Sequence, residues 1–164
     1  MRTFPWLTPR LLLIVLPLLA SCEQAKPKDH VDPPAAAVQT LRTLYPNALA
    51  DSARWERDRD GYYEAHFRLD GLPHKLRTDS VGRYRETEIS IARRALPVPV
   101  QDTLQTQIDR VHDPKIFRVR QVSIVRYADG RTEYEAQVRY DGKWHKRYYD
   151  EKGNLLRESK AKKG

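Results

Sequence analysis

The histidines are the residues of this sequence whose type and spacing come closest to a chemical site. They are His30, His66, His74, His112 and His145. His74 and His145 are each followed by lysine and lie 71 positions apart, and paired imidazoles are groups that bind metal ions or act as general bases. However, no two histidines have the spacing of a zinc-binding helix, and the chain has one cysteine. We therefore expect no metal site.

The same two histidines also fit a structural role. The hairpin register described below places His74 beside Phe67 and His145 beside Val138, on the side of the sheet that faces a helix. An enzyme or metal carrier that uses them is therefore our least favoured hypothesis. The sequence has no nucleophile-elbow, Walker A or dinucleotide-binding motif. We predict that the protein is not an enzyme and uses no cofactor.

The single cysteine, Cys22, follows a leader. Arg2 and Arg10 precede an apolar run over residues 11–20, which is too short to span a bilayer core of ~30 Å and is typical of a signal peptide. The sequence Leu19-Ala20-Ser21-Cys22 resembles a bacterial lipobox. This resemblance implies that residues 1–21 are removed and that Cys22 carries lipid. The alternative is an ordinary secretory signal followed by an unpaired cysteine.

The segment that begins at the cysteine, residues 22–32, is polar after Cys22 and lacks periodicity, so we interpret it as a tether. Ten extended residues could reach roughly 35 Å. Glu23 stands where a retention signal for the inner membrane would have aspartate. We therefore expect an exported protein anchored in the cell envelope, at the outer membrane.

A thirteen-residue stretch occurs twice. Tyr134 to Lys146 reads YEAQVRYDGKWHK, Tyr63 to Lys75 reads YEAHFRLDGLPHK, and eight positions are identical. Alternating residues on both sides of Asp-Gly predict a β-hairpin in each copy. The turn fixes the register, so that Val138 pairs with His145 and Arg139 with Trp144. Each hairpin thus has an apolar face and a charged face dotted with aromatic residues.

The sequence of each half of the chain predicts one helix followed by four strands. The helices begin after Asp32 and Leu96, and the strands cover 52–58, 62–69, 72–78, 83–91, 116–128, 131–140, 143–149 and 154–158, with a bulge near Gln121. We therefore predict an α+β fold with two tandem repeats over 33–95 and 96–159 and a basic tail over 160–164. Each helix would cover the apolar face of a four-stranded antiparallel sheet. Two such units side by side could form one longer sheet with an open face.

The sequence resembles the PepSY-like family, which is related to the β-lactamase inhibitor protein (BLIP) fold. The resemblance is carried by LPVPVQDTLQTQI and YEAQVRYDGKWHKRYYDEKGNLL, and more loosely by AAAVQTLRTLYPNA and YYEAHFRLDGLPHK. It implies a small exported or lipid-anchored bacterial protein with tandem repeats. In the inhibitor relatives a concave sheet face grips a partner protein. Inhibition of a β-lactamase is not carried over, because fold does not imply function.

Aromatic and arginine side chains on the open sheet face are the candidate binding residues. Such residues anchor protein interfaces, and the candidates are Trp144, Tyr148, Arg139, Tyr62 and Trp55. The alternative is that they only strengthen the sheet by cross-strand packing.

The leading hypothesis is a non-enzymatic, lipid-anchored envelope protein that binds a protein or peptide partner on this open face. The alternative is a structural envelope component whose charged face contacts anionic lipid or glycan. The net charge of +8 would also suit nucleic acid, but acids interleave with the bases and an exported protein rarely meets nucleic acid. We therefore expect no nucleic-acid partner.

Overall fold

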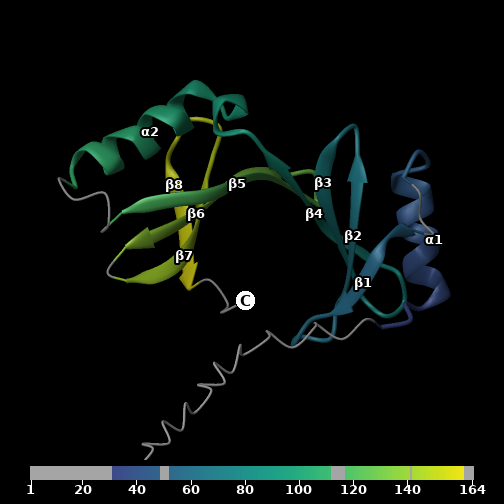
Figure 1. Cartoon of the computed structure of the whole chain (residues 1–164). Coiled ribbons are helices and arrows are strands. Elements are labelled where there is room, and N and C mark those ends of the chain that lie inside the picture. The colour runs from purple at the N-terminus through teal and green to yellow at the C-terminus, as the bar shows by residue number, and fades with distance from the viewer. Residues whose placement is uncertain (1–30, 49–51, 112–116, 141, 161–164) are drawn as a thin grey trace, which may run out of the picture.

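The computed structural model describes residues 31–48, 52–111, 117–140 and 142–160 (Figure 1). Two α-helices lie in this part of the chain, α1 (Ala35–Leu44) and α2 (Val98–Asp109), with a 3-10 turn, η2 (Arg93–Ala95), before the second. The strands are β1 (Arg54–Arg57), β2 (Tyr63–Leu69), β3 (Leu72–Thr78), β4 (Tyr84–Ile91), β5 (Arg118–Tyr127), β6 (Thr132–Tyr140), β7 (Lys143–Tyr149) and β8 (Leu155–Lys160). The α+β class is as predicted.

The eight strands form one antiparallel sheet in the order β1 to β8. Strands β4 and β5 join the two halves, with pairs from Glu86 opposite Tyr127 to Ile91 opposite Val122. The sheet is therefore continuous, and the structure does not divide it into two four-stranded sheets. The register also shifts between Val119 and Gln121, where the sequence predicted a bulge.

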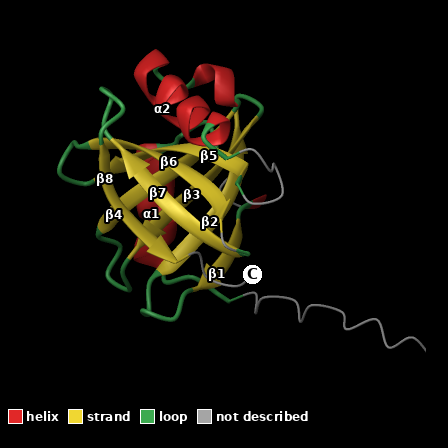
Figure 2. Cartoon of the chain, turned by 90° about the vertical axis from the view of Figure 1, so that its left-hand side faces the viewer, coloured by secondary structure: helices red, strands yellow, loops and turns green. Residues whose placement is uncertain are grey.

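The two helices cover the same side of the sheet and leave the other side open (Figures 1 and 2). Ala37 and Leu41 of α1 are buried in one apolar cluster, and Val100 and Leu104 of α2 are buried in a second. Figure 1 shows the sheet curved, with a helix outside each half and a concave face between the halves. This concave face is the surface that the helices leave accessible.

The hairpin registers agree with the prediction. Val138 pairs with His145 and Arg139 with Trp144 in β6 and β7. In the first copy Asp70 and Gly71 both have positive φ, 51° and 76°, as a two-residue hairpin turn of this type requires.

Three local predictions were wrong. The first helix was expected to begin directly after Asp32 with that residue as its cap, but α1 begins at Ala35 after Pro34 and has no side-chain cap. Strand β8 extends to Lys160, which pairs with His145, so Lys160 belongs to the sheet and not to a tail. Trp55 is 3% exposed and lies in the cluster with Leu41, because its position in β1 points toward α1. It is therefore not on the open face.

Several predictions fall outside the described residues. These are the leader, Cys22 with most of the tether, His30, His112 and the tail from 161 on. Within the described part of the chain, neither helix is long and apolar enough to cross a membrane.

Candidate functional site

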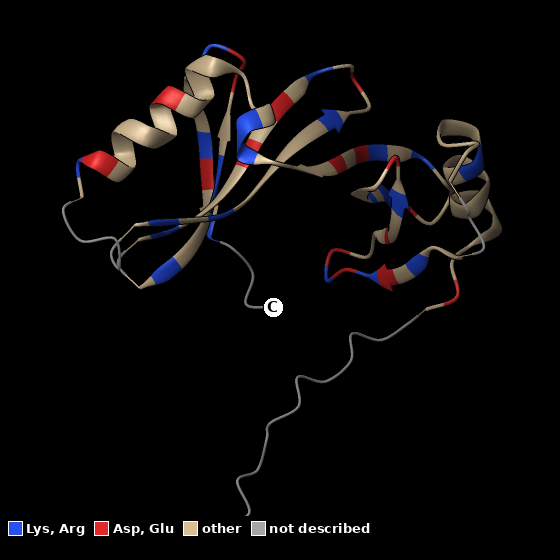
Figure 3. Ribbon diagram, turned by 45° about the horizontal axis from the view of Figure 1, so that its top comes forward, with Lys and Arg blue, Asp and Glu red and all other residues tan. Residues whose placement is uncertain are grey.

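The concave face holds a cleft of about 570 Å³. Its walls come from both halves of the chain and include Asp58, Arg77, Glu88, Lys146 and Tyr148. Along the strands, basic and acidic residues alternate in both halves (Figure 3). The cleft is thus polar, and charges of both signs line it.

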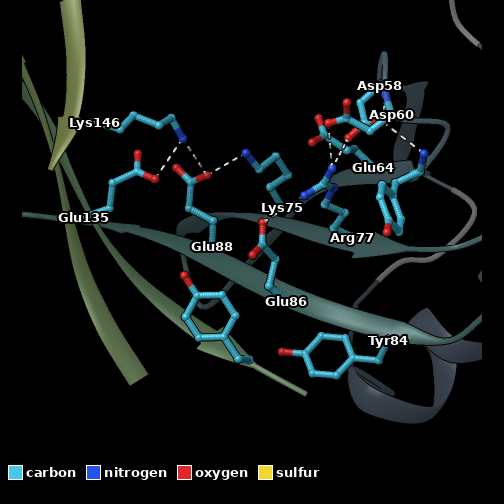
Figure 4. Close-up of polar contacts among 12 residues, drawn as sticks. Asp58, Asp60, Glu64, Lys75, Arg77, Tyr84, Glu86, Glu88, Glu135 and Lys146 are labelled. Carbon is cyan, nitrogen blue, oxygen red and sulfur yellow. Dashed lines mark hydrogen bonds and ion pairs between the residues drawn. The ribbon is translucent and has the colours of Figure 1, made fainter. Parts of the chain in front are cut away.

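At the middle of the cleft two lysines converge on one buried carboxylate (Figure 4). Lys75 Nζ lies 2.5 Å from Glu88 Oε2, and Lys146 Nζ lies 3.7 Å from the same oxygen. Lys146 Nζ is also 2.8 Å from Glu135 Oε2. Ser123 Oγ donates a hydrogen bond of 3.2 Å to Glu88 Oε1. Glu88 therefore links β3, β5 and β7 through its side chain.

The charges of this central group stabilise one another. Burial alone would raise the pKa of Glu88, but the ammonium groups of Lys75 and Lys146 hold this pKa below its ordinary value. Burial would lower the pKa of either lysine, and the nearby carboxylates instead raise it. Burial and the negative charge of Glu88 raise the pKa of Glu135. Glu88 and both lysines are consequently charged at neutral pH.

The two lysines are equivalent positions of the repeated stretch, 71 residues apart. Glu64 and Glu135 are equivalent in the same way. Glu135 binds Lys146, whereas Glu64 stands opposite Arg77 in the register. The cleft is therefore built from matching strands but has a different charge arrangement at each end.

At the first end of the cleft, Arg77 is surrounded by acids (Figure 4). Its guanidinium lies 2.5 Å from Asp58 Oδ2, 3.3 Å from Asp60 Oδ2 and 3.7 Å from Glu86 Oε1. The ring of Tyr62 lies 4.2 Å from the same guanidinium, and Arg85 lies 5.3 Å from that ring. Tyr62, a predicted binding residue, is thus half-buried between two arginines beside the cleft.

At the second end, Tyr148 lies beneath Arg157. The guanidinium carbon of Arg157 is 3.3 Å from the centre of the tyrosine ring, and its NH2 group is 2.8 Å from Glu133 Oε2. Burial and the negative charge of Glu135 raise the pKa of the Tyr148 hydroxyl. Tyr148 lines the cleft but is only 8% exposed, so a partner would meet Arg157 before the ring.

Trp144 and Arg139 lie on the same side of the sheet as the cleft. Trp144 is two positions from Lys146 on β7, and side chains two apart share a face. Both Trp144 and Arg139 are half-buried. The guanidinium found near the Trp144 ring is that of Arg120, at 5.8 Å, and not that of its register partner Arg139.

The repeated histidines do not form one site. His74 stacks on Phe67 with ring centres 5.2 Å apart, and His145 stacks on Tyr140 at 4.1 Å. Phe67 and Tyr140 belong to different apolar clusters. Each histidine therefore packs within its own half, on the helix side, as the register predicted.

A different histidine, His66, lies close to two carboxylates with which it could bind a metal ion. Within the described residues, Glu56, Glu64 and His66 offer one ligand atom each, and these atoms lie within 4.8 Å of one another. Burial lowers the pKa of His66, which outweighs the opposite effect of the two carboxylates. This group could not be predicted from the sequence, because its three residues match no known metal-binding motif and the register of β1 was not predicted.

Solved structures share this fold. A BLIP-like protein from Bacteroides fragilis has 28% identity and a TM-score of 0.61, with 82% of this chain and 91% of that chain covered. A DUF2874 family protein from Bacteroides ovatus has 21% identity, a TM-score of 0.64 and coverages of 79% and 89%. A protein from Bacteroides eggerthii that is provisionally described as periplasmic has 17% identity and a TM-score of 0.64, with 79% of this chain and 90% of that chain covered.

These similarities establish the fold, and the predicted likeness to a BLIP-like protein is confirmed. No family model matches the sequence, and no curated protein matches it. Membership of the PepSY-like family therefore stays a prediction.

Proposed function

We propose that the chain is a non-enzymatic, exported protein that binds a protein or peptide partner in the cleft of its concave face. The observation that carries this proposal is the cleft of about 570 Å³ on the side of the sheet that neither α1 nor α2 covers. Arginine–aromatic pairs flank it at both ends, at Tyr62 and at Tyr148. Arginine and aromatic side chains are the residues that most often dominate binding energy at interfaces.

The charge pairing in the cleft favours a protein over a polyanion. Lys75, Lys146 and Arg77 each have a carboxylate within 2.8 Å. Because these three cations are already paired, the cleft attracts anionic lipid or glycan more weakly than it would if they were unpaired. A protein or peptide, which also carries both signs, can exchange some of these contacts for its own.

The named neighbours support the same class. The Bacteroides fragilis protein is called BLIP-like, and none of the three matched structures carries an enzyme name. We propose an inhibitor-like mode of binding, in which the concave face grips a partner protein. The description of one neighbour as periplasmic supports a location in the envelope.

The domain organisation belongs to the same proposal. It comprises a signal peptide over 1–21, a tether over 22–32 and two repeats over 33–95 and 96–159. The repeat of helix plus four strands in the element order supports the duplication. Cys22 is proposed as the lipidated residue, with the protein anchored in the outer membrane.

Ser159→Trp is expected to block partner binding. Ser159 is exposed and lines the cleft, so a large side chain fills space there without removing any existing anchor. Cross-linking in intact cells, followed by affinity purification, should identify a protein that binds the purified chain one-to-one. Ser159→Trp and, separately, Trp144→Ala should each weaken this complex at least tenfold, which corresponds to about 1.4 kcal/mol.

Val98→Ala is the control for this experiment. Val98 is 67% exposed at the start of α2, on the side of the sheet opposite the cleft, so its replacement should leave the complex unchanged. If Ser159→Trp and Trp144→Ala fold normally and bind as well as Val98→Ala does, partner binding in the cleft is wrong. Binding that disappears with added salt and is insensitive to Ser159→Trp would favour the charged-face alternative.

Cys22→Ser is expected to move the protein from the membrane fraction to the soluble envelope fraction, because serine cannot carry the thioether-linked lipid. Cell fractionation and immunoblotting measure this. Ser21→Ala keeps a small residue before the cysteine and should leave the protein anchored. Retention of Cys22→Ser in the membrane fraction would contradict the lipobox interpretation.

A further inference from the structure

Glu56, Glu64 and His66 form a group of possible metal ligands on β1 and β2, with Lys75 opposite His66 and Arg77 opposite Glu64 on β3. Glu56 of β1 stands directly opposite Glu64 of β2, and His66 stands opposite Arg54, two positions along. All three side chains therefore share the cleft side of the sheet. Glu64 and His66 line the cleft itself.

Two features of the group make it unusual as a structural cluster. Like charges directly opposite on neighbouring strands are destabilising, yet the side chains of Glu56 and Glu64 are only 7% and 19% exposed. In addition, the His66 side chain is 30% exposed, but its Nε2 atom is closed off from solvent and lacks a hydrogen-bond partner within the described part of the chain. Buried polar atoms of this kind call for an explanation, and an ion is one of the few available.

The distances fit a small metal ion. His66 Nε2 lies 3.7 Å from Glu56 Oε2 and 3.9 Å from Glu64 Oε2, which is too long for a hydrogen bond. Ligand atoms placed about 2.1 Å from a tetrahedral zinc ion are separated by about 3.4 Å. Small side-chain rotations would therefore bring the three atoms to coordination distance.

We propose that Glu56, Glu64 and His66 bind a divalent transition-metal ion of the zinc class at the wall of the cleft. One imidazole and two carboxylates suit zinc, which leaves a fourth position for water. The other carboxylate oxygen of Glu56 remains with Arg54, whose NH2 group is 2.6 Å from Oε1. This pairing orients the carboxylate, as outer partners of metal ligands do. The proposal is independent of partner binding in the cleft.

The second half of the chain supplies no equivalent site. The positions 71 residues after Glu56, Glu64 and His66 are Tyr127, Glu135 and Gln137. Only one of these is a strong metal ligand. A single ion per chain is therefore expected.

Isothermal titration with zinc chloride tests the proposal, using the full-length protein in detergent with Cys22→Ser in every sample so that no thiol competes. One-to-one binding in the micromolar range is expected. His66→Gln, which copies the residue of the second half, should weaken binding at least tenfold, and so should Glu64→Gln. His145→Gln is the control, because it makes the same substitution at a histidine that lies beside a carboxylate, Glu158, in the other half of the chain. It should leave the affinity for zinc unchanged.

Cobalt absorption provides a second readout. Cobalt added to the parent protein should give visible absorption bands, which His66→Gln should remove while the circular dichroism spectrum stays unchanged. The absence of saturable zinc binding in the parent protein would overturn the proposal. Zinc binding that survives both His66→Gln and Glu64→Gln would overturn it equally.

Discussion

Glu88→Gln is expected to lower the free energy of unfolding by about 2–4 kcal/mol at neutral pH. Removing one partner of a buried ion pair costs about 3–5 kcal/mol, because the remaining charge is left without compensation. The value is reduced here because the side chains of Lys75 and Lys146 are still 24% exposed. Lys146 also keeps Glu135 at 2.8 Å. Urea unfolding followed by circular dichroism measures the change.

Lys75→Met provides the matched test of this explanation. In the double variant with Glu88→Gln, the uncompensated ammonium is gone, and much of the lost stability should return. Asp129→Asn is the control for a surface pair. Asp129 and Arg131 are 2.7 Å apart but more than half exposed, so the unfolding midpoint should stay unchanged. A Glu88→Gln midpoint equal to that of Asp129→Asn would show that Glu88 does not hold the cleft together.

The central group also predicts how stability depends on pH. The pKa of Glu88 is lowered from 4.5 in the folded state. The stability that Glu88 contributes to folding is therefore fully present above its unfolded pKa and is lost as pH falls through its folded pKa. The pKa values of Lys75 and Lys146 are raised from 10.5. The stability that the two lysines contribute to folding is fully present below that value and is lost as pH rises through their folded pKa. The central group therefore stabilises the protein most between the unfolded pKa of Glu88 and the unfolded pKa of the lysines.

The sequence was sufficient to predict the sheet registers of both hairpins. An Asp-Gly turn fixes which residues face each other, and Arg139 and Trp144 could be placed on the open face from alternation alone. The bulge near Gln121 was predicted in the same way, from the break in alternation along β5. These are local properties, set by residues within one strand pair.

The position of Glu88 could not be predicted, because it depends on contacts between the halves. Lys146 reaches Glu88 only because β4 pairs with β5 and the sheet curves. No turn fixes that pairing, since helix α2 lies between the two strands. Trp55 was misplaced for a related reason: β1 is four residues long, too short for alternation to show which side faces the helix.

Gly82→Ala and Gly153→Ala are expected to destabilise the protein by about 2–5 kcal/mol each. Both glycines have positive φ, 78° and 81°, where an alanine costs about 1–2 kcal/mol. A Cβ at Gly82 would also lie 2.6 Å from Ala36 O, and one at Gly153 would lie 2.5 Å from Pro99 O. These oxygens belong to helix backbone, so relief requires the helix to move, at about 1–3 kcal/mol more.

Gly130→Ala separates the two causes. Gly130 has a φ of 84° and open space where a Cβ would be, so its replacement should cost only the backbone part, about 1–2 kcal/mol. Thermal unfolding of the three variants gives the comparison. If Gly82→Ala lowers the free energy of unfolding by no more than Gly130→Ala does, the close approach of the Gly82 turn to α1 does not hold that helix in place.

The two sensitive glycines also test the duplication. They lie 71 residues apart, and each turn carbonyl accepts a hydrogen bond from a helix threonine, Thr40 at 2.5 Å and Thr103 at 3.1 Å. If the halves descend from one unit, the same turn holds the first part of the helix in both. The two alanine variants should then lose similar stability, and hydrogen exchange should show loosening of α1 in Gly82→Ala and of α2 in Gly153→Ala. If hydrogen exchange shows loosening of the same helix in both variants, the two turns do not each hold the helix of their own half.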